Sequence, residues 1–312
     1  MASTSLVPSI LVSYCSPSPQ FRDSGNLKGS CRRICVSSRR GSRVHAESTS
    51  VPDIWRSSVE KYGDRVAVVD TYHEPPSTFT YKQLEQEILD FVEGLRVVGV
   101  KADEKIALFA DNSCRWLVAD QGIMATGAVN VVRGSRSSVE ELLQIYRHSD
   151  SVALVVDNPE FYNRIAETFS KKAPLRFVIL LWGDKSSLVT SGRKTPVYCY
   201  NDIKSLGHEG RARFGAGSYD AGKYKYESIH PDDIATIMYT SGTTGNPKGV
   251  MLTHQNLLHQ IRNLSEFVPA KAGERFLSML PSWHAYERAC EYFIFTCGVE
   301  QKYTSIRFLK DD

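Results

Sequence analysis

The chain has 312 residues, of which 42% are hydrophobic, 23% charged and 10% aromatic. Such a composition is close to the average for folded globular proteins, so it excludes a fibre, a disordered tail and a small disulfide-stapled domain. The net charge is +3, from 38 Lys and Arg against 35 Asp and Glu, so the chain is neither strongly basic nor strongly acidic.

The first 46 residues differ from the rest of the chain. They contain seven basic residues, one acidic residue and 11 serines, which leaves 31 basic and 34 acidic residues for the remainder. A Ser-rich, Arg-rich and acid-poor start is typical of an organelle transit peptide, whereas a secretory signal carries positive charge ahead of its apolar stretch. We therefore expect a plastid transit peptide over 1–46, with the mitochondrion as alternative destination and an ordinary disordered tail as the competing interpretation.

The residues after the leader argue against a nucleic-acid partner, a disulfide or metal framework, and a membrane span. Their mildly acidic balance argues against a nucleic-acid partner, because the basic residues gather only in the leader. Their four cysteines, Cys114, Cys199, Cys290 and Cys297, form no Cys-x-x-Cys pair, so we expect buried apolar thiols and no disulfide or metal framework. The strongly apolar windows are far shorter than the roughly 20 residues of a membrane-spanning helix. No transmembrane span is expected, and peripheral association with a membrane is left open.

From Ser50 onward, short apolar runs alternate with longer amphipathic stretches. This pattern predicts an α/β fold with layered, parallel-rich sheets covered by helices. Thr80 with Gln83, and Ser138 with Glu141, have the spacing of helix-capping boxes, and Pro159 suits the start of a third helix. The predicted strands cover 65–70, 105–110, 128–132, 152–156, 176–182, 234–239 and 276–280, and helices lie between them. The Gly-, Ser- and Lys-rich segment 183–229 is predicted to be a long surface excursion or a subdomain join.

The segment from Tyr239 to Val250 is the most informative part of the sequence. It reads Tyr-Thr-Ser-Gly-Thr-Thr-Gly-Asn-Pro-Lys-Gly-Val, with three glycines, four hydroxyl side chains and Lys248 between two apolar runs. Glycines allow backbone N–H groups to approach an anion, hydroxyls donate hydrogen bonds, and lysine adds positive charge. These residues predict a polyphosphate-binding loop, with a glycine-rich structural turn as the alternative.

Two common phosphate-binding motifs do not fit this segment. A Walker-type loop that starts at Gly242 would need glycine at Pro247, and Ser or Thr at Gly249. The dinucleotide fingerprint fails as well, because the glycines stand at 242, 245 and 249.

The segment resembles the signature of the AMP-forming acyl-activating superfamily, the adenylating ligases of fatty acids and amino acids. A second motif of that family follows, Leu-Pro-Ser-Trp-His-Ala-Tyr-Glu-Arg over 280–288. The residues of this second motif, together with the leader, most resemble those of the plastid long-chain acyl-acyl-carrier-protein synthetases of plants. The resemblance covers about 51–312 and is strongest over 230–312. It identifies 47–312 as an incomplete amino-terminal domain of an adenylate-forming ligase.

The resemblance implies ATP and Mg²⁺ as cofactors and a two-step reaction. A long-chain fatty acid would displace pyrophosphate from ATP, and the thiol of acyl carrier protein or coenzyme A would then take the acyl group. His284 and Lys248 would be catalytic, and Thr243 would contact Mg²⁺. The nucleotide would be bound by residues of the loop, namely Thr240, Ser241, Gly242, Thr243, Thr244, Gly245 and Lys248. Of the neighbouring residues, Trp283 and Tyr286 could line an acyl pocket or belong to the core, Glu287 and Arg288 could be a solvated pair, and His254 is expected to be structural.

The later motifs of the family are not found before Asp312, and neither is its small lid domain. The sequence therefore predicts a truncated form with little ligase activity of its own. A non-catalytic nucleotide-binding or interaction fragment remains an alternative, and so does a phosphate-loop transferase of another fold, which Pro247 and Gly249 contradict.

Overall fold

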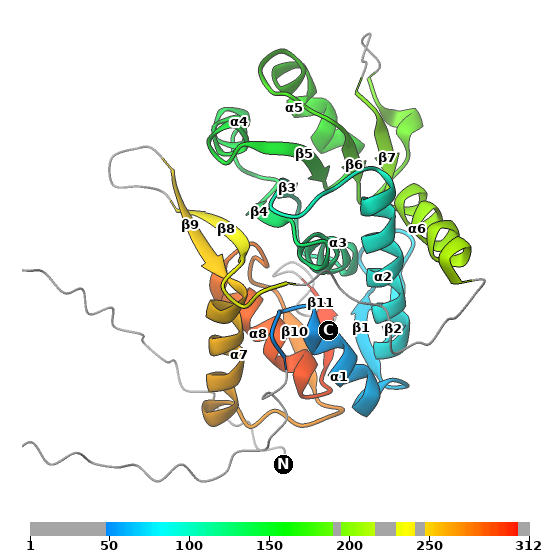
Figure 1. Cartoon of the computed structure of the whole chain (residues 1–312), viewed down its shortest axis with the longest axis vertical. Helices are drawn as coiled ribbons and strands as arrows, with labels where there is room; N and C mark the ends of the chain where they lie inside the picture. Colours follow the sequence, from blue (N-terminus) through cyan, green and yellow to red (C-terminus); the bar gives the residue numbers. More distant parts are fainter. Residues whose placement is uncertain (1–47, 190–194, 216–228, 241–246, 305–312) are drawn as a thin grey trace, which may run out of the picture. The chain divides into compact units, whose positions relative to one another are not determined.

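The computed structural model describes residues 48–189, 195–215, 229–240 and 247–304. These residues form helices and strands that alternate along much of the chain (Figure 1). The helices are α1 (Asp53–Tyr62), α2 (Tyr81–Val97), α3 (Cys114–Ala125), α4 (Val139–His148), α5 (Pro159–Lys172), α6 (Tyr200–Gly215), α7 (His254–Phe267), α8 (Ala285–Thr296) and the short 3-10 helix η2 (Lys185–Ser187). The strands are β1 (Val66–Asp70), β2 (Ser77–Thr80), β3 (Lys105–Phe109), β4 (Val129–Arg133), β5 (Ser151–Val156), β6 (Val178–Leu180), β7 (Val197–Cys199), β8 (Ile234–Thr240), β9 (Lys248–Thr253), β10 (Arg275–Ser278) and β11 (Glu300–Tyr303).

The larger sheet has seven described strands in the order β7-β6-β5-β3-β4-β8-β9. All its neighbouring strands are parallel except β8 and β9, which run antiparallel. Successive side chains of a strand point to opposite faces of a sheet. Accordingly, Ala107 packs with residues of α4 and α5 on one face, whereas Leu108 packs with residues of α2 and α3 on the other. The predicted α/β fold with a parallel-rich, helix-covered sheet is confirmed.

The smaller sheet has four described strands in the order β10-β11-β1-β2. Strands β10, β11 and β1 are mutually parallel, and β2 returns antiparallel to β1. Helix α3 contacts β1 of this sheet as well as β3 and β4 of the larger one, while α8 contacts β10 and β11. These two helices therefore lie between the sheets, and the turn before α8 comes close to the carboxyl ends of strands from both.

Local signals place most of these elements correctly. The Thr80 hydroxyl accepts a hydrogen bond from the Gln83 N–H at 3.2 Å, and the Gln83 side chain accepts from the Thr80 N–H at 2.9 Å, so the predicted capping box is present. Ser138 caps α4 by accepting from the Glu141 N–H at 3.1 Å. Gly99, just after α2, has φ +88°, a conformation that favours glycine. None of the described helices is both long and apolar enough to cross a membrane.

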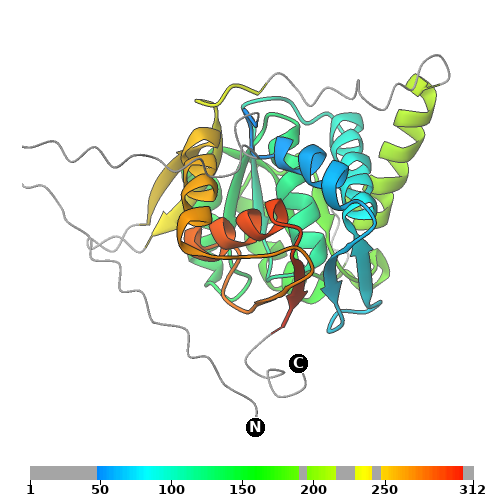
Figure 2. The same cartoon turned by 90° about the horizontal axis from the view of Figure 1, so that it is seen from below.

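The segment 183–229 is more regular than its composition predicts. It contains η2, β7 and the 16-residue helix α6, so the expectation of a plain surface excursion was wrong. Helix α6 runs beside α2 (Figures 1 and 2). A Cβ atom on Gly207 would lie 1.7 Å from the Asp90 carbonyl oxygen, and one on Gly94 would lie 2.0 Å from the Ile203 carbonyl oxygen. These glycines permit close contact between two helices, which composition alone does not distinguish from a loop.

The packing of α6 on α2 predicts a large effect of one methyl group. Replacing Gly207 with alanine forces the helices apart, and overpacking of this kind lowers the free energy of unfolding by about 1–3 kcal/mol. Gly210→Ala is the matched control, because its Cβ would first meet the flexible Glu93 side chain, at 3.1 Å. Alanine is favoured over glycine inside a helix by about 1 kcal/mol, so the control should be neutral or stabilising. Urea unfolding of both variants measures the difference, and equal midpoints would contradict the packing argument.

Candidate active site

The predicted phosphate-binding loop connects β8 to β9. Thr240 is the last residue of β8, Lys248 is the first residue of β9, and the two are paired across the antiparallel ladder. Both residues are exposed. Because β8 is followed by a strand and not by a helix, the structure confirms that this is no Walker-type loop. The predicted site residues Ser241, Gly242, Thr243, Thr244 and Gly245 lie outside the described residues.

Arg133, which sequence reasoning did not single out, links the base of this loop to the second motif. It is the last residue of β4, and its guanidinium donates to the Tyr239 carbonyl oxygen at 3.3 Å and to the Glu141 carboxylate at 2.6 Å. The guanidinium also lies 4.8 Å from the centre of the Trp283 ring, a cation–π contact. The end of β8 and the residue before His284 are therefore held by one side chain.

His284 occupies the N-cap position of α8, and its Nδ1 accepts a hydrogen bond from the Tyr286 N–H at 3.3 Å. Strand β10 ends at Ser278, two residues earlier than predicted, so a turn separates the strand from His284. Asn112, which follows β3, holds this turn: its amide donates to the Leu280 carbonyl oxygen, and its side-chain oxygen accepts from the Ser282 N–H at 2.7 Å. The aromatic neighbours of His284 differ in surroundings, because Trp283 lines a pocket whereas Tyr286 is exposed.

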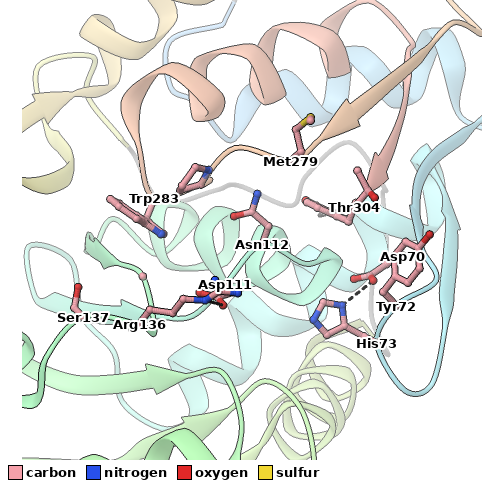
Figure 3. Close-up of a pocket in the computed structure, with 13 residues that line it drawn as sticks. Asp70, Tyr72, His73, Asp111, Asn112, Arg136, Ser137, Met279, Trp283 and Thr304 are labelled. Atoms are coloured by element: carbon pink, nitrogen blue, oxygen red, sulfur yellow. Dashed lines mark hydrogen bonds and ion pairs between the residues drawn. The ribbon is translucent and has the colours of Figure 1, made fainter. Parts of the chain in front are cut away.

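The pocket has a volume of about 800 Å³ and opens at the carboxyl ends of strands from both sheets. Figure 3 shows Trp283 and Ser137 toward one end, His73 and Thr304 toward the other, and Asn112 between them. In open α/β sheets, ligands bind at this edge because several strands deliver side chains to one place. The lining residues come after β1, β3, β4, β10 and β11 or end those strands, and they are Asp70, Tyr72, His73, Asp111, Asn112, Gly134, Arg136, Ser137, Met279, Pro281, Trp283, Tyr303 and Thr304.

Several charged groups line or approach the pocket. The His73 Nδ1 lies 2.8 Å from the buried Asp70 carboxylate, and this partner and the charge of Asp157 raise the His73 pKa although burial opposes the shift. Burial raises the pKa of Asp157 to about 6, and the nearby Asp111 adds to the shift. Arg136 lies 3.6 Å from Asp111 at the exposed rim. The pocket therefore offers both a hydrogen-bonding wall and the apolar surface of Met279 and Trp283.

Glu287 and Arg288 are not a solvated pair, contrary to one expectation. Their exposed fractions are 2% and 0%, and Arg288 pairs with Asp120 of α3. Burial raises the pKa of Glu287 to about 7, although hydrogen bonds from Ser278 and from the Met279 and Leu280 N–H groups oppose the shift. Sequence reasoning missed the burial of Arg288 because its partners Thr236 and Asp120 are 52 and 168 residues away. His254 is structural as predicted, since its buried Nδ1 accepts from the Val51 N–H at 3.1 Å.

The burial of Glu287 predicts a pH dependence of stability. A folded-state pKa of about 7, above the ordinary value of 4.5, means that the folded chain holds this proton more tightly than the unfolded chain. The stabilising contribution is complete below about pH 4.5 and is lost as the pH rises to about 7. Glu287→Gln removes this dependence, so its melting temperature should rise relative to the wild type between pH 5 and pH 8. Glu266→Gln, at an exposed position of α7, is the control; parallel pH curves for wild type and Glu287→Gln would contradict the prediction.

Comparison with known proteins places this arrangement in a family. The family model described as AMP-binding enzyme matches residues 55–308. The chain belongs to the AMP-binding enzyme family. Both motifs named above, over 239–250 and 280–288, lie within the matched range, so the family resemblance seen in the sequence is confirmed.

Two proteins of Arabidopsis thaliana align with the whole of this chain. One, described as probable acyl-activating enzyme 16, chloroplastic, is 76% identical. The other, a long-chain-fatty-acid-(acyl-carrier-protein) ligase, also described as chloroplastic, is 67% identical. The chain spans about half the length of these curated relatives, 48% and 47% respectively.

Solved structures support the fold of this chain. A long-chain-fatty-acid-CoA ligase from Archaeoglobus fulgidus matches with a TM-score of 0.67 and 22% identity, over 81% of this chain and 46% of that one. The N-terminal domain of FACL13 from Mycobacterium tuberculosis matches with a TM-score of 0.64 and 20% identity, over 82% of this chain and 57% of that one. At these identities the likeness establishes the fold, which is that of the amino-terminal domain of such ligases.

Proposed function

We propose that the protein activates a long-chain fatty acid as an acyl-adenylate and passes the acyl group to a thiol. In the first step, a carboxylate oxygen attacks the α-phosphorus of ATP and pyrophosphate leaves. In the second, the thiol sulfur attacks the acyl carbon, AMP leaves, and the thiol proton goes to solvent. The membership of the AMP-binding enzyme family and the names of the two Arabidopsis relatives support this proposal.

One structural observation carries the proposal. The hairpin between β8 and β9 stands at the carboxyl edge of the large sheet, and Arg133 ties its base to Trp283, which adjoins His284 and lines the pocket. The described base of the glycine- and hydroxyl-rich segment is thereby linked to a residue of a pocket large enough for an organic ligand, which supports the proposal. A polyphosphate bound by the loop would place its α-phosphate toward the turn of His284.

The residues of the loop suit a magnesium–nucleotide complex. Exposed Thr240 and Lys248 flank it with a hydroxyl and a cation, both of which suit the oxygens of a polyphosphate. Within the described ranges, no cluster of three acidic, His or Cys side chains could hold a metal ion. Mg²⁺ would be bound together with ATP, with Thr243 as a protein ligand, and it would neutralise phosphate charge. Ser241, Thr244 and Lys248 would hold the departing phosphates, the glycines Gly242 and Gly245 would let the backbone approach them, and His284 would contact the reacting carboxylate.

The acceptor and the location form part of the same proposal. The acceptor is a thiol of acyl carrier protein or coenzyme A, because relatives of both kinds are found: the 67% identical Arabidopsis protein is named for the carrier protein, and a 31% identical protein of Mycobacterium tuberculosis for coenzyme A. The two Arabidopsis relatives are described as chloroplastic, which supports a plastid location and a transit-peptide role for 1–46.

The test is an assay of the two half-reactions with a protein as long as the curated relatives, of which this chain spans about half. Pyrophosphate release is measured with ATP, Mg²⁺ and palmitate, and the acyl-adenylate is trapped with hydroxylamine. Acyl transfer is then compared between acyl carrier protein and coenzyme A. We expect release that depends on the fatty acid, whereas no release with any carboxylic acid would overturn the proposal.

A further inference from the structure

A buried polar cluster joins β8 to α8 behind the candidate active site. Its centre is Arg288, which has no exposed surface. One guanidinium nitrogen donates to the Thr236 hydroxyl of β8 at 2.7 Å, the Nε donates to the Tyr292 hydroxyl at 2.7 Å, and the third nitrogen pairs with the Asp120 carboxylate of α3. Each of the three guanidinium nitrogens therefore has a partner.

The partners of Arg288 are themselves held in place. Asp120 accepts from the Asn130 amide of β4 at 2.6 Å and from the Tyr292 hydroxyl. The Thr236 hydroxyl, which accepts from Arg288, donates in turn to the Asn130 carbonyl oxygen at 2.7 Å. The hydrogen bonds thus close a ring through α3, β4, β8 and α8, and none of its members lines the described pocket.

Stability alone is a poor explanation of such a cluster. Removing two charges from water costs so much free energy that apolar side chains of similar volume often stabilise a core equally well. What a buried arginine provides is geometry, because its planar fork fixes the directions of several partners at once. Here the partners are Thr236 of β8, Tyr292 of α8 and Asp120 of α3, so the fork joins the two elements that carry the site and a third helix.

The sequence positions show what this geometry controls. Thr236 stands four residues before Thr240, where the loop begins, and Arg288 stands four residues, about one helical turn, after His284. The bond between Thr236 and Arg288 therefore sets the position of α8 relative to β8, and with it the position of His284 relative to the loop.

We propose that Arg288 is a positioning residue that couples β8 to α8, so that the loop and His284 act on the same bound substrate. This inference rests on the proposed function for its kinetic consequence. Its structural consequence, that cutting one hydrogen bond loosens both elements together, does not depend on the reaction.

The test uses a protein as long as the curated relatives. Three variants of it are compared, each with a single substitution that keeps most of the core volume filled. Thr236→Val removes the acceptor on β8 and leaves the Arg288–Asp120 pair intact. Arg288→Lys keeps the charge but cannot serve three partners in the directions of the fork. Thr236→Ser retains the hydroxyl and is the conservative rescue. Because a small misplacement of reacting groups costs mainly the chemical step, we expect kcat for pyrophosphate release to fall about tenfold or more in the first two variants. We expect the KM for ATP to stay within about twofold, and Thr236→Ser to recover most of kcat.

Arg211→Met is the matched control. Arg211 also makes a largely buried pair, with Asp90, but it joins α6 to α2 away from the site. Hydrogen–deuterium exchange is measured on all variants. Faster exchange in both β8 and α8 of Thr236→Val, with Arg211→Met affecting only α2 and α6, would support the coupling even if no fatty acid were activated. Unchanged exchange in β8 and α8 of Thr236→Val would overturn the proposal. So would a loss of kcat in Thr236→Val that is no greater than the loss in Arg211→Met at equal destabilisation.

Discussion

Replacing Lys248 with alanine is expected to slow pyrophosphate release. The expected loss of transition-state stabilisation is about 2–4 kcal/mol, the usual scale for one electrostatic contact in an active site. Lys248 begins β9 and is exposed at the edge of the sheet where the loop returns. In the proposed reaction negative charge moves onto the departing pyrophosphate, so a cation at this place would stabilise the transition state more than the bound substrate. The loss should therefore appear in kcat, measured in the pyrophosphate-release assay with saturating ATP and palmitate.

Lys271→Ala is the control for this substitution. Lys271 is also exposed, but it precedes β10 and so lies toward the amino end of that strand, opposite the edge that carries the site. It should leave kcat unchanged. If Lys248→Ala kept the wild-type rate, or lost no more than Lys271→Ala, the assignment of the loop to pyrophosphate would fail.

Replacing Arg288 with methionine is expected to destabilise the fold by about 3–5 kcal/mol, because it leaves the Asp120 carboxylate buried without its cation. Asp120 has no exposed surface, so water cannot replace the lost partner. The measurement is the free energy of unfolding from urea denaturation at neutral pH. In a domain of marginal stability, a loss of this size is a large part of the total.

Two further variants show whether the unpaired charge is the cause. The double variant Arg288→Met with Asp120→Asn removes both charges and should recover much of the lost free energy. Arg176→Met breaks a pair with Glu104 that is partly exposed, and pairs of that kind contribute only about 0–1 kcal/mol. If Arg288→Met lowered the free energy of unfolding no more than Arg176→Met, the unpaired Asp120 carboxylate would not be the cause of a large loss.

Where sequence reasoning succeeded, the signal was local. The capping box of Thr80 and Gln83 involves residues three apart, and the apolar spacing of α2 reports its buried face within a few turns. The apolar run of β5 predicts a strand buried on both faces without reference to any partner. The phosphate-binding interpretation of 239–250 rests on a local signal of the same kind, the residue types and spacing of one loop, and it stays a prediction.

Where sequence reasoning failed, the deciding neighbours were distant in the chain. Arg288 and Asp120 are 168 residues apart, and nothing near Arg288 in the sequence distinguishes a buried fork from a solvated charge. Asn112 holds Ser282 across 170 residues, so its role in placing the His284 turn could not be predicted. The segment 183–229 was interpreted as a surface excursion or a subdomain join because only the presence of α2 makes Gly207 a contact between helices.

By itself, then, the sequence determined the alternation of strands and helices and the capped helix starts, because these depend on hydrogen bonds and spacings within a few residues, and it predicts the chemistry of the loop. Only the tertiary structure decided which charged side chains are buried, which strand ends meet around the pocket, how Arg133 connects the end of β8 to Trp283, and how Arg288 connects β8 to α8. The physical reason is that desolvation and ion pairing depend on what packs around a group, and most of those neighbours come from parts of the chain far away in sequence.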